Sequence, residues 1–189
     1  MLSVIIPTEG AEHPAVATLA ALVAGAASGV VAEVLLVDRG GSQVIERVAD
    51  VAGCRYLAVT GSRGEILASG ARQARSPWLM FLHAGAVPDP GWVDEAMRFM
   101  RQVADSGRPR AAVFRYARAP HYEPTWRDGL KFLARRIAGP FPDQGLLIAR
   151  DHYERLGGHA PNAARAEAQL LRQLGRSSLA LLRSRVVMV

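Results

Sequence analysis

Polar residues follow three apolar segments in the first half of the chain. Thr8-Glu9 comes after residues 2–7, Asp38-Arg39 closes residues 31–38, and His83 follows residues 78–82. Each segment is a continuous apolar run of the kind that forms a buried parallel strand. Parallel strands end at a common edge of their sheet, and α/β proteins bind ligands there. The spacing therefore predicts a ligand site built from Thr8, Glu9, Asp38, Arg39 and His83.

The elements that would position these residues alternate along the sequence. Strands are expected at 2–7, 31–38, 54–59, 78–82, 111–116 and 144–149, and helices after Pro14, from about residue 44, and at 63–75, 92–104, 151–156 and 163–174. The helix positions expected to face the core are Val16, Leu19, Ala20, Val23, Val44, Ile45, Val48, Val51, Val93, Ala96, Met97 and Met100. Such alternation with short loops predicts a parallel sheet with helices on both faces.

Length and composition exclude several classes of protein. The 189 residues suit one domain, and 50% hydrophobic residues argue against disorder. No apolar run reaches the roughly 18 residues that span a bilayer, and residues 1–7 resemble no signal peptide. The single cysteine, Cys54, excludes a disulfide framework. We expect a cytoplasmic protein in which Cys54 is an inert core thiol and His13, His121, His152 and His159 lie on the surface.

The charge is unevenly distributed. Residues 1–97 carry a net charge of −4 and residues 98–189 a net charge of +10. A basic half favours a polyanionic partner such as a nucleotide or an anionic membrane surface, although solvated faces rich in arginine explain it equally. Nucleic acid is a poor candidate, because aromatic residues make up only 6% and form no stacking motif.

Four motifs occur in a fixed order: SVIIPT, LLVDRGGS, FLHAGAVPDPGW and FPDQGLLIARDHYERLGG. This order resembles the family 2 glycosyltransferases of the GT-A fold, and most closely the bacterial branch with F-L-H-A-D and D-Q-G motifs. The resemblance extends from Ser3 to about Arg176. It implies an α/β, three-layer, nucleotide-diphospho-sugar transferase-like fold with a mostly parallel central sheet. It also implies a single domain whose residues 1–104 bind the nucleotide and whose residues 105–189 face the acceptor.

The resemblance also assigns a donor site for a UDP- or GDP-sugar. The matching positions are Pro7, Thr8, Glu9 and Asp38 for the base and ribose, Arg63 near the diphosphate, His83 after the fourth strand, and Asp143 and Gln144 beside the sugars. Alternatives remain for three of these positions. Asp38 is also placed to cap the following turn, Arg63 to be solvated at a helix start, and Asp143-Gln144 to form a turn into a strand.

Two positions depart from the family pattern. Gly85 stands where the family has the aspartate that binds Mn²⁺ or Mg²⁺, so a metal is expected only if His83 or Asp89 replaces it. Asp89, between two prolines, is better placed to shape a turn. The family's catalytic base falls on Ala163 and Ala164, which leaves Glu167, one turn later, and Asp143 as weak candidates for catalysis.

Two functions remain open. One is a sugar-transferring enzyme whose usual carboxylates have been replaced, and the other is a non-catalytic module that binds a nucleotide-sugar or serves as a scaffold. The apolar stripe Trp126, Leu130, Leu133 and Ile137, flanked by Arg127, Lys131, Arg135 and Arg136, fits packing against the sheet. It also fits the anionic inner face of a membrane, since acceptors in the family are often lipid-linked.

Overall fold

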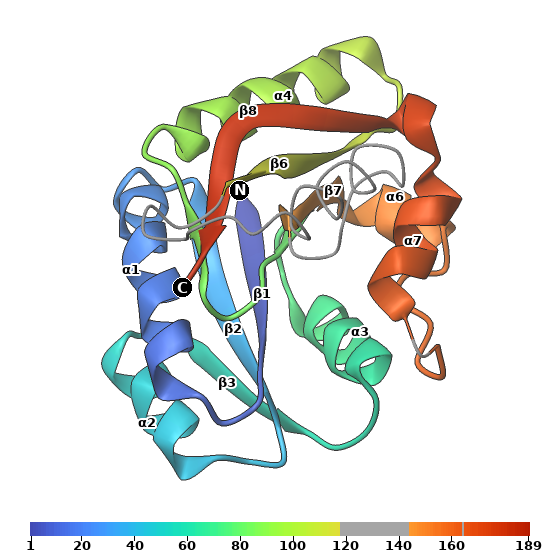
Figure 1. Cartoon of the computed structure of the whole chain (residues 1–189). Helices are drawn as coiled ribbons and strands as arrows, with labels where there is room; N and C mark the ends of the chain where they lie inside the picture. The colour runs from blue at the N-terminus through green and yellow to red at the C-terminus, as the bar shows by residue number, and fades with distance from the viewer. Residues whose placement is uncertain (118–143, 164) are drawn as a thin grey trace, which may run out of the picture.

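The computed structural model describes residues 1–117, 144–163 and 165–189. In chain order its elements are β1 (Leu2–Thr8), α1 (Glu12–Ala27), β2 (Val31–Arg39), α2 (Gln43–Val51), β3 (Arg55–Val59), α3 (Arg63–Gln73), β4 (Trp78–Phe81), β5 (Ala86–Pro88), α4 (Trp92–Ser106), β6 (Ala111–Ala117), β7 (Leu146–Ala149), α6 (Arg150–Arg155), α7 (Ala166–Leu174), the 3-10 turn η2 (Arg176–Ser178) and β8 (Leu179–Met188) (Figure 1). The strands form one sheet in the order β3-β2-β1-β4-β7-β6-β8-β5.

Strand β1 lies in the parallel part of this sheet. It pairs in parallel with β2 on one side and with β4 on the other, and β2 pairs in parallel with β3. Thr8 is level with Asp38, and the amide of Leu82 continues the ladder by donating to the carbonyl of Ile5. The expected parallel strands are therefore confirmed, and Asp38 and His83 lie at the same edge. Antiparallel pairing of β7 with β4 and β6 makes the sheet mixed.

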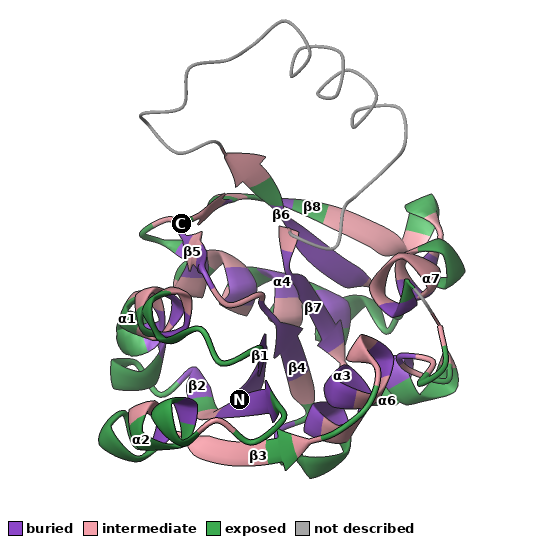
Figure 2. Cartoon of the chain, turned by 60° about the horizontal axis from the view of Figure 1, so that its bottom comes forward, coloured by how far each residue is buried: buried purple, intermediate pink, exposed green. Residues whose placement is uncertain are grey.

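Helices cover both faces of the sheet, which gives the predicted three layers. Alternate residues of β1 separate the two cores: Val4 and Ile6 face α1, α2 and α4, whereas Ile5 faces α3, α6 and α7. In Figure 2 the central strands are largely buried and the outward sides of α1 and α2 are exposed. Within the described ranges no helix is long and apolar enough to cross a membrane.

The core-facing positions of the first two helices differ from those expected. In α1 the buried residues are Ala15, Thr18, Leu22 and Gly25, whereas Val16 and Val23 are exposed. In α2, Ile45 and Ala49 are buried and Val44 and Val51 are exposed. Because α1 has no charged residue after its first turn, its sequence carries no polar marker of the outer face. Close packing against the sheet favours the small side chains of α1 on its buried face.

Strands β5 and β8 were not expected from the sequence. β8 pairs in parallel with β6 and antiparallel with β5, and so covers the start of the segment that follows His83. Arginines at 183 and 185 interrupt the apolar pattern of β8, because this face of the strand is exposed. Helix α7 begins at Ala166 and not at residue 163. It is followed by β8, which packs against α4, so the last described element is a strand and not the expected helix.

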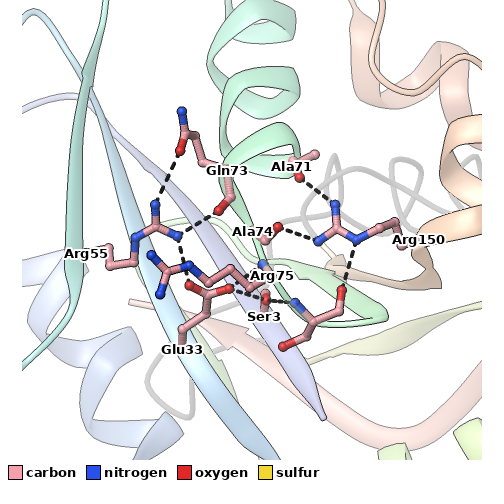
Figure 3. A network of polar contacts seen from close by, with 9 residues as sticks. Ser3, Glu33, Arg55, Ala71, Gln73, Ala74, Arg75 and Arg150 are labelled. Atoms are coloured by element: carbon pink, nitrogen blue, oxygen red, sulfur yellow. Dashed lines mark hydrogen bonds and ion pairs between the residues drawn. The ribbon is translucent and has the colours of Figure 1, made fainter.

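A polar network ties the amino edge of the sheet together, opposite the candidate ligand site (Figure 3). The hydroxyl of Ser3 donates to Glu33 at 2.7 Å, and Arg55 donates to the same carboxylate at 2.9 Å. Nearby, the Arg150 guanidinium donates to the carbonyls of Ala71, Ala74 and Ser76 at 2.7 to 3.0 Å. Arg150 thereby satisfies carbonyls at the carboxyl end of α3.

We expect Arg150→Ala to lower the free energy of unfolding by about 3 kcal/mol, because it leaves three carbonyls without their charged donor. Arg155→Ala is the matched control, since among the described residues that exposed side chain donates to the carbonyl of Asp151 on its own helix. Urea unfolding of the two variants measures the difference. Equal losses would show that Arg150 does not hold the end of α3.

Candidate functional site

Helix α3 begins at the carboxyl edge of the sheet. Ser62 caps it by accepting the amide of Glu65 at 3.1 Å, and Arg63 is its first residue. A Cβ at Gly64 would overlap the carbonyl oxygen of Ala160 and lie 3.0 Å from the Cβ of Ala166. Because glycine has no side chain, the first turn of α3 contacts the chain leading into α7 (Figure 1).

This contact brings together Arg63, His83 and Glu167. Arg63 donates from Nε to Glu167 Oε2 at 3.0 Å and from Nη2 to Oε1 at 3.1 Å. His83 Nε2 lies 2.9 Å from Glu167 Oε1, and Arg63 Nη2 lies 2.9 Å from His83 Nδ1. The three side chains are 31%, 21% and 18% exposed. Glu167 therefore points toward the strand edge and not into solvent.

The charge of Glu167 is fixed by its partners. Burial acts to raise the pKa of its carboxyl, but hydrogen bonds from His83 and Arg63 and the charge of Arg63 outweigh burial and lower the pKa to about 2. The group is therefore a carboxylate at neutral pH, bound by a guanidinium in the two-pronged geometry typical of strong arginine–carboxylate pairs.

A small cavity lies beneath this cluster. Its lining residues are Pro7, Leu67, Phe81, Leu82, His83, Gly145, Leu146, His159, Glu167 and Leu171. It encloses about 20 Å³, enough for about one water-sized group. The cavity is too small for a nucleotide, and two members of the cluster, His83 and Glu167, line it.

His159 is buried at the side of this cavity. Its backbone amide donates to the hydroxyl oxygen of Tyr153 at 3.0 Å, and the same oxygen lies 2.9 Å from His159 Nδ1. Since that oxygen accepts the amide, its own proton is free to point at Nδ1, which leaves the proton of the neutral imidazole on Nε2. Burial lowers the pKa of His159 to about 4, and burial raises the pKa of Tyr153 to about 12.

The expectation of surface histidines is wrong at two positions. His159 is 2% exposed and His152 is 7% exposed, whereas His13 is exposed as expected. The reason for His159 is the Gly157-Gly158 turn, where Gly158 has φ +64 and its Cα lies against the ring of Tyr153. His121 lies outside the described residues. Cys54 is partly buried against the core, and burial raises its pKa.

Asp38 is fully buried and bound to its own chain. Its carboxylate accepts the Thr8 hydroxyl at 2.7 Å and the amides of Gly10 and Ser42 at 3.0 and 2.7 Å. It therefore connects the end of β1 to the Ser42 cap of α2, as the turn-capping alternative predicts. Glu9 is exposed and lies 3.8 Å from Arg39.

The acceptor-side candidates are only partly described. Gln144 donates from Nε2 to the carbonyl of Phe114 at 2.8 Å. Asp143, Ala164 and the stripe from residue 126 to 137 lie outside the described residues. Sequence reasoning missed Tyr153 and His159 as residues beside the site, and the only signal was the Gly157-Gly158 pair.

The residues around Gly85 do not fit a divalent cation. Gly85 has φ +91, a Cβ there would lie 2.7 Å from the carbonyl oxygen of Val189, and its amide donates to the carbonyl of Pro14 at 2.8 Å. The Asp89 carboxylate accepts the amide of Arg185 in β8, and its own amide donates to the Arg185 carbonyl. The Asp89 carbonyl accepts the amide of Trp92 at 3.2 Å, which is the expected turn. The described parts of the chain contain no cluster of three or more metal-ligating side chains.

Comparisons with known proteins identify the fold. No family model matches the sequence, and no curated protein matches it. Many solved structures share the fold, among them three that align with 98 to 100% of the chain. They are a mannosyltransferase from Pyrobaculum calidifontis in complex with GDP-Man and Mn²⁺ (TM-score 0.68, 17% identity), glucosyl-3-phosphoglycerate synthase from Mycobacterium tuberculosis in complex with Mn²⁺, UDP and glucosyl-3-phosphoglycerate (0.67, 18%) and S. aureus TarS 1-349 (0.66, 14%).

The chain has the GT-A glycosyltransferase fold. It is a mixed, mostly parallel α/β structure, as the sequence resemblance implied. The chain spans 56%, 70% and 60% of the lengths of these three structures. At such identities the likeness establishes the fold alone.

We expect stability to fall on acidification because of His159. Its pKa of about 4 in the folded protein lies below its ordinary 6.5, so the unfolded chain binds a proton that the folded chain does not. Between about pH 7 and about pH 5 this group should lower the free energy of unfolding by about 2 kcal/mol. His159→Gln should remove this share of the loss, and the exposed His13→Gln should not. Urea unfolding at the two pH values tests it, and an unchanged pH dependence in His159→Gln would contradict it.

We also expect that an aspartate introduced at position 85 destabilises the fold and does not create a metal site. Gly85→Asp should destabilise the protein by about 1–3 kcal/mol, because the added Cβ meets Val189 and the positive φ disfavours a side chain. Gly85→Ala should cost a similar amount. Thermal unfolding with and without Mn²⁺ tests both variants, and stabilisation of Gly85→Asp by Mn²⁺ would prove the expectation wrong.

Proposed function

We propose that this chain is a glycosyltransferase-like protein that binds a UDP- or GDP-sugar without a divalent cation and transfers the sugar very slowly or not at all. The observation that carries the proposal is the contact of Arg63 with His83, which lies at the carboxyl edge of β1, β2 and β4, two residues before Gly85. Arg63 supplies positive charge where the family resemblance expects a diphosphate, and His83 supplies ring nitrogens that can form hydrogen bonds. The solved structures with the same fold include complexes with GDP-Man, UDP and UDP-GlcNAc.

Two features support binding without a metal. Position 85 offers no side chain and is covered by Val189, and Asp89 is held in its turn by Arg185. Charge on a diphosphate would then be balanced by Arg63 and by amides at the start of α3, which bind phosphate directly. Asp38 and Thr8, which bind each other, would shape the surface on which the base rests.

The electrostatics of Glu167 support slow transfer. A general base works best when its pKa is near the working pH, and a carboxyl with a pKa of about 2 is a weak base at pH 7. Loss of a metal bridge also removes several kcal/mol of stabilisation from the departing nucleotide. Active transfer is the second candidate, favoured by the fact that Glu167 lines the cavity, with Asp143 as the alternative base.

The division of labour within the chain is part of the proposal. Residues 1–104 would hold the nucleotide, and residues 105–189, with their net charge of +8, would face the acceptor. A basic acceptor side suits a phosphorylated or lipid-linked acceptor at an anionic membrane surface, which would place a cytoplasmic protein peripherally at that membrane.

Calorimetric titration with UDP- and GDP-sugars, in EDTA and in Mn²⁺, tests the proposal. We expect the affinity to be the same in both, and Arg63→Gln to weaken it by about tenfold, the loss of one charge-assisted contact. Arg72→Gln is the matched control, because Arg72 lies in the same helix but pairs with Glu65. Release of nucleotide should stay near the background rate. Rapid turnover that requires Mn²⁺ would disprove the proposal.

A further inference from the structure

The carboxylate of Glu167 occupies the most cationic position at this edge. Both of its oxygens are bound by Arg63, and His83 approaches one of them at 2.9 Å. Resting on the proposed function, we infer that Glu167 is an internal competitor for the diphosphate of the ligand. Arg63, His83 and the start of α3 form an anion site that the Glu167 carboxylate occupies. Binding of a diphosphate there must therefore displace the carboxylate.

The geometry of this anion site suits a phosphate group as well as a carboxylate. Arg63 presents Nε and Nη2 to two separate oxygens, the pattern by which arginine binds either anion. It is also the first residue of an eleven-residue helix, whose amino end carries partial positive charge. A diphosphate has more charge and more oxygens than one carboxylate, and would therefore compete effectively for the same donors.

Glu167 is placed where release is feasible. It is the second residue of α7, and Arg165, which precedes this helix, makes no side-chain cap. Leu170 and Leu174 anchor the helix in the core through its later turns. The Glu167 side chain can thus move away from Arg63 while Ala166, buried against Gly64, and the later turns of α7 stay packed.

Competition of this kind lowers the apparent affinity of the ligand. The anion site is available only in the fraction of molecules in which Glu167 has left it. The apparent dissociation constant is the intrinsic constant divided by that fraction. Removing the carboxylate charge should restore the intrinsic affinity. Glutamine keeps the shape of the side chain and its hydrogen bonding but not its charge, so Glu167→Gln isolates this effect.

The experiment compares wild type, Glu167→Gln and Glu154→Gln by calorimetric titration with inorganic pyrophosphate, UDP and uridine. Glu167→Gln should bind pyrophosphate and UDP about tenfold more tightly than wild type. This is the gain expected if Glu167 occupies the anion site in about nine-tenths of the wild-type molecules. Uridine has no phosphate, so its affinity should not change. Glu154→Gln removes the same charge at an exposed position, 62% accessible, and should leave all three affinities unchanged.

Each result separates the inference from the proposed function. If wild type binds UDP and Glu167→Gln binds it equally or more weakly, the inference is overturned and the proposed function stands. If Glu167→Gln binds pyrophosphate more tightly than wild type but neither protein binds UDP, the inference holds and the proposal of a nucleotide ligand fails. If neither protein binds UDP or pyrophosphate, both fail.

Hydrogen exchange of the wild-type protein provides a measurement that does not depend on the stability of a variant. Saturating pyrophosphate should increase amide exchange at Gln169, whose amide donates to the carbonyl of Arg165 in the first turn of α7, because this turn loses the contact of Glu167 with Arg63. Binding of pyrophosphate with no change in exchange at α7 would overturn the inference.

Discussion

The close approach of α3 to its neighbours is the constraint on which the site depends. A Cβ at Gly70 would lie 2.5 Å from Ile5 Cγ2 and 3.0 Å from Val37 Cγ2, and one at Gly64 would overlap the Ala160 carbonyl. The two missing side chains let one helix pack tightly on β1 and β2 and, one and a half turns earlier, on the chain before α7. Arg63 is thereby held between a strand end and a second helix.

From that position the electrostatics follow. Arg63 is close to both His83 and Glu167, and a partly buried arginine without an anion would be costly. Glu167 satisfies that requirement within the chain, and a bound phosphate would satisfy it equally. The same edge contains a contrasting carboxylate, Asp38, which is saturated by Thr8, Gly10 and Ser42 and takes no part in the exchange of partners. Asp38 is thus structural, whereas Glu167 is the carboxylate that we propose a bound phosphate displaces.

The sequence was sufficient to predict the layers, the parallel strands around β1, and the meeting of Asp38 and His83 at one edge, because apolar runs that end in polar residues determine all three. It did not predict that Glu167 faces the site, since a glutamate one turn into a helix has no local signal for direction. That direction comes from Gly64 and Ala160, which lie far apart in sequence. His159 was misassigned for a similar reason, as its burial depends on the turn at Gly158 that folds it against Tyr153.

A glycine at position 85 is consistent with the rest of the edge. Val189 donates its amide to the Gly85 carbonyl at 3.0 Å, and its own carbonyl fills the space beside the Gly85 Cα. The backbone pairing of β5 with β8 therefore occupies the place from which an aspartate would reach a metal. A diphosphate bound at this edge would therefore take its positive charge from a side chain, and Arg63 is the cation that α3 brings there. A guanidinium in a partly buried position needs an anion, and Glu167 supplies that anion in the free protein.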